Sequence, residues 1–360
     1  MRRAPAGVRD SPPAALLHQR ERGPAAGRAA HGRQSGRRRP SGRPPLSERI
    51  RADLEAALGR AVESVAPIPT GHSGFTYWVD LEGKRAVMRL PPPGARIAGP
   101  ADIPRQARLM DALHRAGLPV PALLAASDQP VVDGRPFYLV EAVQGMRIEQ
   151  VIGSVPDREI ARSAVAVLKQ MQAIPVAETG IEDEHAMGLK QEVERWAWLM
   201  DRAPAELTTE APALAECLLT ALPQERPPVM VHADYHYGNM LFEGSKIVAL
   251  LDWEISKLGQ PLLDLACLAV VARASRSGSD EVPGGGAVTV DDRELLEMYG
   301  PDADDFGWYL ALTYYKYASI FGYNLMLHRR GKRPDPIYEE RTTTIVDFIA
   351  EGRRLMSQAR

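Results

Sequence analysis

Three polar side chains near residue 240 have the spacing that phosphoryl transfer requires. Asp234 lies five residues before Asn239, which lies thirteen residues before Asp252. Transfer from ATP needs one carboxylate to orient the attacking hydroxyl and accept its proton. It also needs an amide oxygen and a second carboxylate to hold Mg²⁺ on the phosphates. The pattern His232-x-Asp234-x-x-x-x-Asn239, followed by Asp252, supplies these groups. It predicts a catalytic base at Asp234 and metal ligands at Asn239 and Asp252.

The segments around these residues predict the elements that position them. The apolar run 228–231 predicts a short strand that leads into the loop. Residues 240–251 predict two strands of a hairpin with Gly244 in its turn. This hairpin would bring Asn239 and Asp252 close enough to share one Mg²⁺ ion, which needs few protein ligands. The alternative is an ordinary polar loop between core strands, with solvated acids.

The charge of the chain is unevenly distributed. The 360 residues have a formal net charge of −2, and 45% are hydrophobic, as in ordinary soluble globular proteins. Residues 1–44 contain eleven arginines and two acidic residues, so they carry +9 and the remaining 316 residues carry −11. The acidic body argues against nucleic acid as a specific partner. The Arg-, Pro- and Gly-rich segment 1–44 predicts a disordered tail.

The sequence shows no feature of a membrane or secreted protein. It has no apolar run long enough to cross a bilayer, and its start does not resemble a secretory signal. Cys217 and Cys267 are far apart in sequence and lie in apolar surroundings, which predicts buried free thiols in a reducing compartment. We therefore expect a cytoplasmic protein.

The hydrophobic pattern changes its period near residue 146. Before that point, residues 75–90 and 122–143 predict paired strands, and 104–116 predict a helix, so a five-stranded sheet with one packed helix is expected. After it the pattern is mainly helical, and the Ser- and Gly-rich segment 275–290 predicts a surface loop. The helices predicted in this second part cover residues 160–173, 189–201, 306–327 and 338–356.

Over residues 50 to 350 the chain resembles the aminoglycoside phosphotransferase and choline kinase family. The catalytic motif carries the resemblance, together with Gly259-Gln260-Pro261-Leu262-Leu263-Asp264-Leu265, which is similar to a G-D-P-x-x-D-L segment of that family. Within the family it most resembles phosphotransferase domains related to those fused to acyl-CoA dehydrogenases. The resemblance implies an α+β, bilobal protein-kinase-like fold. The implied parts are the tail 1–44, an N-terminal nucleotide-binding lobe at 45–145 and a mainly helical catalytic and substrate-binding lobe at 146–360.

The resemblance also implies nucleotide contacts in the small lobe. Gly71 and Gly74 belong to a segment that resembles the loop covering the phosphates, where glycines let backbone N–H groups approach phosphate oxygens. An ordinary hairpin turn is the alternative. Glu141 and Val143 belong to a segment that resembles the hinge, whose main chain faces the adenine. A plain core strand is compatible with that role.

Two positions depart from the pattern of kinases. Kinases place a Lys on the third strand, paired with a Glu on the following helix. Here Arg89 stands at the Lys position, and its fork of donors can hold two phosphate oxygens. Gln106 stands at the Glu position, on the apolar face of the predicted helix. A neutral amide can orient an arginine, but it cannot neutralise its charge.

The resemblance implies supporting roles for residues beside the catalytic motif. Asp264 would brace the catalytic loop, and His232 would do the same as a neutral side chain. His236 occupies a place where some kinases carry a Lys that touches the transferred phosphate, and the alternative is a surface histidine. Glu254 is either a group near the metal or a charge at the start of a helix.

Two classes of function remain open. The first is an ATP- and Mg²⁺-dependent kinase that phosphorylates a small hydroxyl-bearing substrate. The basic segment 329–333 agrees with a hydroxyacyl thioester as that substrate, whereas the acidic body permits an aminoglycoside-like antibiotic. The second is a pseudokinase or nucleotide-binding scaffold without turnover. Retention of Asp234, Asn239 and Asp252 favours the first.

Overall fold

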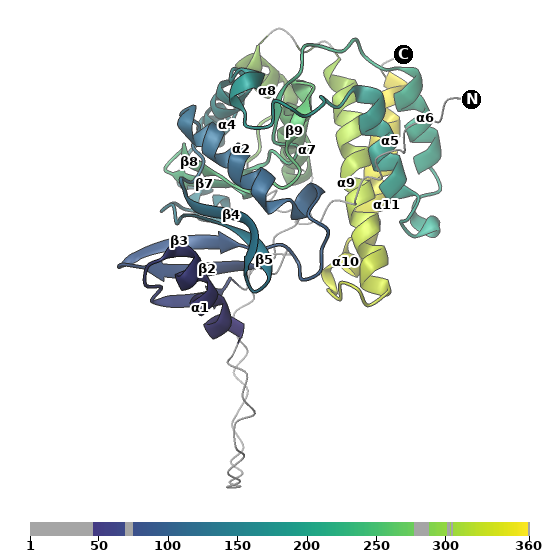
Figure 1. The fold of residues 1–360 in the computed structure, drawn as a ribbon. Helices are drawn as coiled ribbons and strands as arrows, with labels where there is room; N and C mark the ends of the chain where they lie inside the picture. The colour runs from purple at the N-terminus through teal and green to yellow at the C-terminus, as the bar shows by residue number, and fades with distance from the viewer. Residues whose placement is uncertain (1–45, 69–74, 277–287, 301–302, 304, 359–360) are drawn as a thin grey trace, which may run out of the picture.

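The structure, a computed structural model, describes residues 46–68, 75–276, 288–300, 303 and 305–358. In Figure 1 a small sheet-containing lobe lies below a larger, mainly helical lobe. The predicted tail 1–44 lies outside the described residues. No helix among those that are described is both long and apolar enough to cross a membrane.

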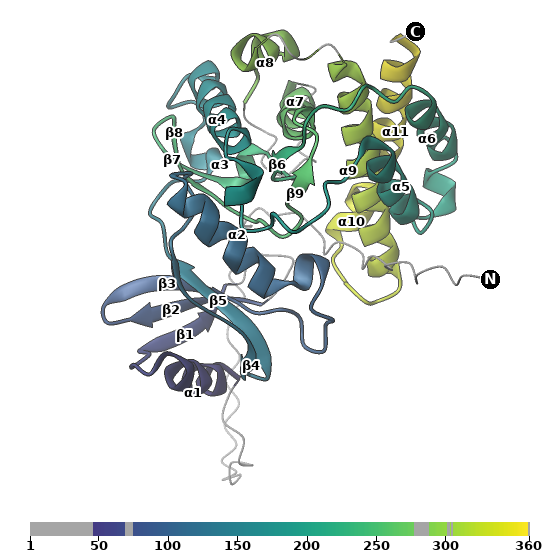
Figure 2. The same cartoon turned by 45° about the horizontal axis from the view of Figure 1, so that its top comes forward.

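The small lobe is built on a five-stranded antiparallel sheet, as predicted. The strand order is β1-β2-β3-β5-β4. Helix α1 covers the outer face of the sheet, and α2 lies between the sheet and the large lobe (Figure 2). The elements are α1 Leu46–Leu58, β1 Ser64–Pro67, β2 Thr76–Leu81, β3 Lys84–Arg89, α2 Ile103–Arg115, β4 Leu123–Val132 and β5 Arg135–Glu141.

Two tight turns set the register of this sheet. Glu82 and Gly83 have φ angles of 51° and 74° and join β2 to β3, and Asp133 and Gly134 have 49° and 69° between β4 and β5. Two consecutive positive φ angles give the turn whose twist matches a hairpin. The register that follows pairs Arg89, the last residue of β3, with Tyr138 of β5. Arg89 therefore stands at the end of β3, facing the large lobe.

The large lobe surrounds the catalytic segment with helices and two small sheets. Strand β6 pairs with β9, and β7 pairs with β8. Its main elements are α3 Ile148–Val151, α4 Asp157–Gln172, α5 Leu189–Met200, α6 Ala211–Thr220, β6 Val229–Val231, β7 Met240–Glu243, β8 Lys246–Leu250, β9 Lys257–Gly259, α7 Leu262–Arg276, α8 Asp292–Tyr299, α9 Phe306–Arg329, α10 Ile337–Glu340 and α11 Thr342–Gln358.

Helix α9 is the central helix of this lobe. Most of its side chains are buried, and it packs against α5, α7 and α11. Figure 1 shows α9 and α11 running side by side, with α5 and α6 beside them. A helix that is apolar nearly all round must lie in the core of a larger protein. Polar side chains within α9, such as Lys316, are therefore buried and need partners inside the protein.

Some sequence expectations were wrong in detail. The helix predicted at 338–356 is two helices, α10 and α11, which are separated by Arg341 at a φ of −100°. The predicted loop 275–290 is also not a surface loop at its end, because Val288 and Val290 are buried in the main core. The middle of that segment, 277–287, lies outside the described residues.

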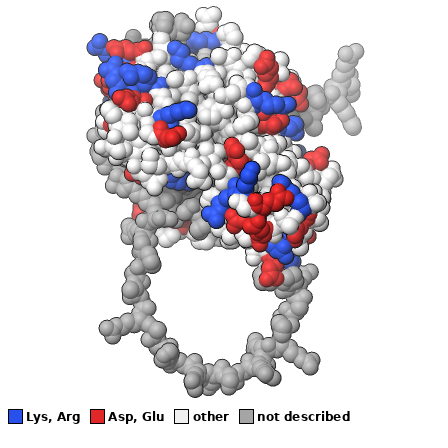
Figure 3. Space-filling view, turned by 90° about the vertical axis from the view of Figure 1, so that its left-hand side faces the viewer, with Lys and Arg blue, Asp and Glu red and all other residues white. Residues whose placement is uncertain are grey.

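The two cysteines are free, as expected, but only Cys267 is fully buried. Charged side chains of both signs are intermixed on the face shown in Figure 3.

Candidate active site

The catalytic loop, residues 232–239, is braced by Asp264, at the start of α7. Its two carboxylate oxygens accept hydrogen bonds from the backbone N–H groups of His232 (2.7 Å) and Ala233 (2.8 Å). Burial raises the pKa of Asp264 to about 6, although these two hydrogen bonds act in the opposite direction. Ala233 has a φ of 67°, an uncommon conformation for a residue with a side chain. The predicted bracing role of Asp264 is confirmed.

His232 is a second brace, also as predicted. Its Nδ1 accepts from the backbone N–H of Asp234 at 3.2 Å, and its Nε2 lies 2.8 Å from the carbonyl oxygen of Leu251. These contacts place the single ring proton on Nε2. Burial lowers the pKa of His232 to about 4, so the ring is neutral at neutral pH. It ties the loop to the strand end before Asp252.

Asp234 is buried and held by three side chains. Oδ2 lies 3.0 Å from Asn239 Nδ2 and 3.1 Å from His236 Nε2, and Oδ1 accepts from the Tyr317 hydroxyl at 3.2 Å. Burial by itself raises the pKa of Asp234. The His236 ring, followed by Lys316, outweighs burial and leaves that pKa well below its usual range. The carboxylate is therefore ionised and can accept a proton.

His236 is not a surface histidine, so that alternative is wrong. Its Nδ1 accepts from the N–H of Gly238 at 3.1 Å, so Nε2 carries the proton and donates to Asp234. The residue is only 5% exposed. In this arrangement both ring nitrogens are occupied within the loop.

The hairpin formed by β7 and β8 brings the two predicted metal ligands together. Its first pair is Met240 opposite Leu250. Beyond that pair, the N–H of Leu251 donates to the carbonyl oxygen of Asn239 at 2.8 Å. Asp252 follows with a φ of 65°, which turns the chain sharply at this point. The predicted proximity of Asn239 and Asp252 is confirmed.

Arg89 joins the small lobe to this hairpin. One guanidinium nitrogen donates to Asp252 Oδ1 at 3.1 Å, and the other donates to Glu254 Oε2. Burial raises the pKa of Glu254 to about 8, with a further contribution from Asp252 and an opposing one from Arg89. Glu254 is buried and precedes strand β9 rather than a helix, so its alternative role as a charge at a helix start is wrong.

Gln106 does not contact Arg89, contrary to the sequence expectation. Its amide donates to the carbonyl oxygen of Pro100 at 2.9 Å, and its own oxygen has no hydrogen-bond partner among the described residues. Gln106 is buried, and its amide is held by the segment just before α2 rather than by the end of β3. The carboxylate partners of Arg89 are therefore Asp252 and Glu254, and residue 106 is not one of them.

The donor atoms around Asp252 suit a hard cation. Within the described residues, no group of three or more His, Cys, Asp or Glu side chains is arranged to hold a metal ion. A Mg²⁺ bound with nucleotide needs only one or two protein oxygens, since phosphates and water supply the rest. Asp252 and Glu254 already meet a positive charge, that of Arg89. Asn239 and Asp252 carry oxygens of the kind that Mg²⁺ prefers, and the hairpin brings the two residues together.

The remaining nucleotide residues are only partly placed. Gly71 and Gly74 lie outside the described residues. At the predicted hinge, which follows β5, the backbone N–H of Glu141 donates to the carbonyl oxygen of Ala122. Val143 is half-buried, and no main-chain hydrogen bond from it to other described residues is formed. Of the two predicted hinge residues, Val143 has the main chain that can meet an adenine.

Two site residues were not predicted, and both come from α9. Tyr317 contacts the carboxylate of Asp234, and Lys316 Nζ donates to the carbonyl oxygen of Ala233. They lie more than eighty residues from the loop, so no local spacing reveals them. The available signal is Lys316 itself, a charge inside an aromatic helical run.

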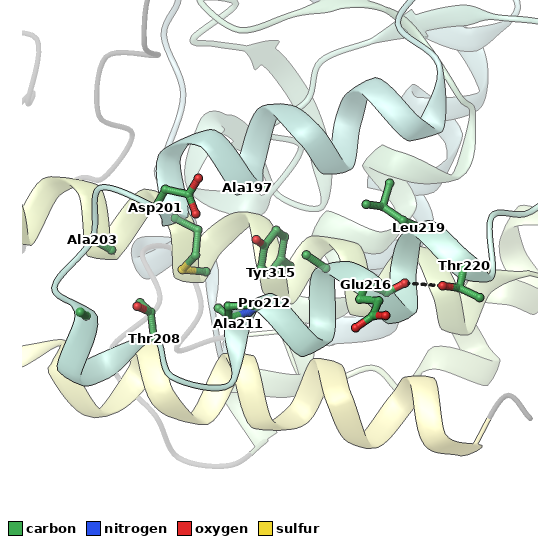
Figure 4. A pocket seen from close by; sticks show the side chains of 13 residues that line it. Ala197, Asp201, Ala203, Thr208, Ala211, Pro212, Glu216, Leu219, Thr220 and Tyr315 are labelled. Atoms are coloured by element: carbon green, nitrogen blue, oxygen red, sulfur yellow. Dashed lines mark hydrogen bonds between the residues drawn. The ribbon is translucent and has the colours of Figure 1, made fainter.

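A pocket of about 490 Å³ lies elsewhere in the large lobe, among α5, α6 and α9 (Figure 4). Asp201 and Glu216 lie on opposite sides of Tyr315 in this view. Tyr315 and Tyr317 are two residues apart on a helix and so point to different faces. None of the residues that line the pocket belongs to the catalytic loop.

Comparisons with known proteins agree on one family. The sequence model of the phosphotransferase enzyme family matches residues 64–299, more than half of the chain. Acyl-CoA dehydrogenase family member 10 of Mus musculus is 29% identical over 268 residues. The match covers 69% of this chain and 25% of that protein, so the chain spans about a quarter of this relative's length.

Solved structures share the fold. A protein of Ralstonia eutropha JMP134, assigned as an aminoglycoside phosphotransferase, has a TM-score of 0.71 at 24% identity, over 85% of this chain and 98% of its own. Aminoglycoside phosphotransferase APH(4)-Ia, in a complex with ADP and hygromycin B, has a TM-score of 0.54 at 14% identity, over 86% and 98%. The α+β, bilobal protein-kinase-like fold is thus shown, and the chain belongs to the phosphotransferase enzyme family.

Proposed function

We propose that the protein transfers the γ-phosphate of ATP to a hydroxyl group of a small molecule, with Asp234 as the base. The observation that carries the proposal is the state of Asp234. It is buried, ionised and fixed by three side chains, and it lies beside Asn239, which the hairpin places next to Asp252. Positioning and charge stabilisation supply most of the catalysis in such transfers.

Each residue has a defined task in this proposal. Asp234 orients the acceptor hydroxyl and takes its proton as the oxygen attacks. Asn239 and Asp252 would hold Mg²⁺, which supplies positive charge on the phosphates. Arg89 leaves Asp252 and turns its fork of donors toward phosphate oxygens, while Glu254 keeps it near the site. ATP as donor is supported by the ADP bound in the structurally similar APH(4)-Ia.

For the acceptor, we propose a hydroxyacyl thioester or another small alcohol. The relative from Mus musculus is named an acyl-CoA dehydrogenase family member, which makes an acyl thioester a reasonable candidate. The turn after α9 adds weak support. Arg329 there is neutralised by Glu206 and Glu339, but Arg330 and Lys332 are exposed and make no ion pair among the described residues.

An aminoglycoside acceptor is the alternative, and the names of the similar structures favour it. A polycation needs carboxylates that are not already paired. Two acids that could have served are engaged. Glu184 accepts from Arg105 at 2.7 Å, and Asp292 is paired with Arg273. These contacts reduce the negative charge that such a substrate would meet.

A nucleotide-binding scaffold without turnover is the second function. It is favoured by the contact between Arg89 and Asp252, which occupies a predicted metal ligand. Reversible contacts of this kind are also expected in an enzyme before nucleotide binds, so retention of Asp234, Asn239 and Asp252 supports the enzyme.

The test is a screen for phosphorylated product. The purified chain is incubated with Mg·ATP and, separately, with 3-hydroxybutyryl-CoA, choline and hygromycin B, and products are detected by mass spectrometry. Asp234→Asn is the inactive variant, and Asp201→Asn, an exposed carboxylate at the distant pocket, is the matched control. Product from the wild type and the control, but not from Asp234→Asn, supports the enzyme. Nucleotide binding without any product would support the scaffold.

A further inference from the structure

The two oxygens of Asp234 have different surroundings. Oδ2 already meets two donors, Asn239 Nδ2 and His236 Nε2. Oδ1 meets one, the hydroxyl of Tyr317, at 3.2 Å. A carboxylate oxygen has two lone pairs and accepts about two hydrogen bonds. Among the described contacts, Oδ1 is therefore the oxygen with room for an attacking hydroxyl, and Tyr317 already lies against it.

The contact with Tyr317 is fixed by the residue before it. Lys316 Nζ donates to the carbonyl oxygen of Ala233 and lies 3.4 Å from Cys267 Sγ. Two consecutive residues of α9 thus bind two consecutive residues of the catalytic loop. Lys316 is 5% exposed, and its hydrogen bonds among the described residues are to a carbonyl oxygen and a thiol, not to a carboxylate. The hydrogen bond from Lys316 to the carbonyl oxygen of Ala233 thus ties α9 to the catalytic loop beside Asp234.

Tyr317 also keeps the chemistry of a donor. Burial, together with the nearby Cys267 and Asp234, raises the pKa of Tyr317 well above 10. The hydroxyl therefore retains its proton at neutral pH and donates it to Oδ1, as the hydroxyl of an acceptor would. The side chain is 4% exposed, and its ring stacks on Phe321 with centroids 6.3 Å apart. While the Tyr317 hydroxyl donates to Oδ1, a water molecule cannot take that position on the carboxylate.

We propose that Tyr317 is a positioning residue that protects Asp234 Oδ1 from water until an acceptor binds. The inference rests on the proposed function. In the unwanted reaction, a water oxygen would attack the γ-phosphorus, the bond between that phosphorus and the bridging oxygen of ADP would break, and the water proton would pass to Oδ1. With Tyr317 on Oδ1, water is not oriented there. The hydroxyl of an acceptor is held in place by the rest of the acceptor molecule. It can therefore displace Tyr317 from Oδ1 or share that oxygen with it.

The test compares ATP hydrolysis with phosphate transfer in Tyr317→Phe, which removes only the hydroxyl. The matched control is Tyr315→Phe, on the same helix but lining the distant pocket. ADP release is measured with Mg·ATP alone and again with 3-hydroxybutyryl-CoA or whichever probe the product screen identifies. Melting temperature and the KM for ATP are recorded for each variant to detect a purely structural effect.

In Tyr317→Phe we expect acceptor-free ADP release to rise roughly tenfold relative to phosphate transfer, the scale of one hydrogen bond to a charged group. The KM for ATP and the melting temperature stay close to wild type, and Tyr315→Phe resembles wild type throughout. An unchanged or lower ratio in Tyr317→Phe, with a wild type that transfers phosphate, overturns the inference alone. A wild type that binds nucleotide but neither hydrolyses nor transfers overturns the proposed function as well.

Discussion

At the scale of single residues, the neutral ring of His232 and the carboxyl group of Asp264 hold the loop that carries the ionised base, Asp234. His232 and Asp264 are both buried and form hydrogen bonds with backbone groups of the loop and of the strand end beside it. Asp234 is equally buried, yet its donors keep it charged. Environment alone thus divides similar side chains between bracing and proton acceptance.

The partner of Arg89 can be tested by exchange. In Arg89→Lys a single ammonium cannot contact Asp252 and Glu254 in the fork geometry of a guanidinium, so we expect the KM for ATP to rise roughly tenfold. Glu254→Gln should have an effect in the same direction, because one of the two carboxyl oxygens beside the guanidinium is replaced by an N–H donor. Gln106→Glu in the Arg89→Lys background should give no recovery, since residue 106 faces Pro100. Recovery there would mean that Gln106, not Glu254, lies beside Arg89. Steady-state kinetics with varied ATP concentration measure the KM for ATP of each variant.

The pKa of His232 predicts a loss of stability in acid. It falls to about 4 in the folded chain, from an ordinary value of 6.5, so folding disfavours the protonated ring. The stabilisation is complete above pH 6.5 and is lost as the pH falls through 4, by roughly 3 kcal/mol in total. Asp264, whose pKa is raised to about 6, acts oppositely between pH 4 and 6.

The contribution of His232 is therefore isolated by difference. Urea unfolding is measured at pH 7 and pH 4.5 for the wild type and for His232→Gln, which retains a donor for Leu251. The wild type should lose more unfolding free energy between the two pH values than the variant. Equal losses would show that His232 is already protonated or unperturbed in the fold.

The sequence predicts these residues unevenly, for a physical reason. Asp234, Asn239 and Asp252 are placed by local spacing and a hairpin, so their proximity follows from nearby residues. The pairing of Arg89 with Glu254 joins residues 165 positions apart, and no local pattern reports it. Tyr317 is similar: its helical spacing predicts burial, but not the identity of the residue that it touches.

At the scale of elements, the link between the lobes is a close contact of two backbones. After β5, Met146 exchanges backbone hydrogen bonds with Phe242 of β7, both at 2.8 Å. Gly145 lies against the same hairpin, and a Cβ there would stand 2.8 Å from Val248 Cγ2 and 2.9 Å from Leu241 Cβ. The segment after β5 is thus hydrogen-bonded to the hairpin that is followed by Asp252.

Gly145→Ala should consequently disturb both stability and nucleotide binding. Relief of the overlap requires the hinge or β7 to move, at a cost of about 1–3 kcal/mol in unfolding free energy, with a higher KM for ATP. Gly307→Ala is the control, because a Cβ at Gly307, in α9, meets no atom within 4 Å. It should stabilise slightly, by about 0.5–1 kcal/mol, as alanine does within helices. Urea unfolding of both variants measures these changes. An unfolding free energy that is unchanged in Gly145→Ala would contradict the close contact.

Elements defined by local signals were predicted, and those defined by packing were not. The turns at Gly83 and Gly244 fix two hairpins from the sequence alone. Strand β9 has only three residues and exists through its pairing with β6, so its period is too short to recognise. Helix α8 begins at a capping box formed by Asp291 and Glu294, a signal hidden beside the Ser- and Gly-rich segment.

At the scale of the whole molecule, the site is assembled from both lobes. Arg89 comes from the small sheet, Asp234 and Asp252 come from the large lobe, and Tyr317 comes from the helix at its centre. We propose the division into lobes at 45–145 and 146–360, with the hinge at their boundary. Movement of the small lobe would then carry Arg89 from Asp252 to the nucleotide, which couples nucleotide binding to release of the metal ligand.

The most direct measurement compares the binding of Mg·ATP with its turnover in Asp234→Asn. Calorimetry measures the dissociation constant, and product detection with the identified acceptor measures kcat. Because Asp234 acts in the chemical step, the variant should bind Mg·ATP as tightly as the wild type and lose at least about 100-fold in kcat, the usual contribution of a general base. A variant that still transfers phosphate at the wild-type rate would contradict the assignment of Asp234 as the base.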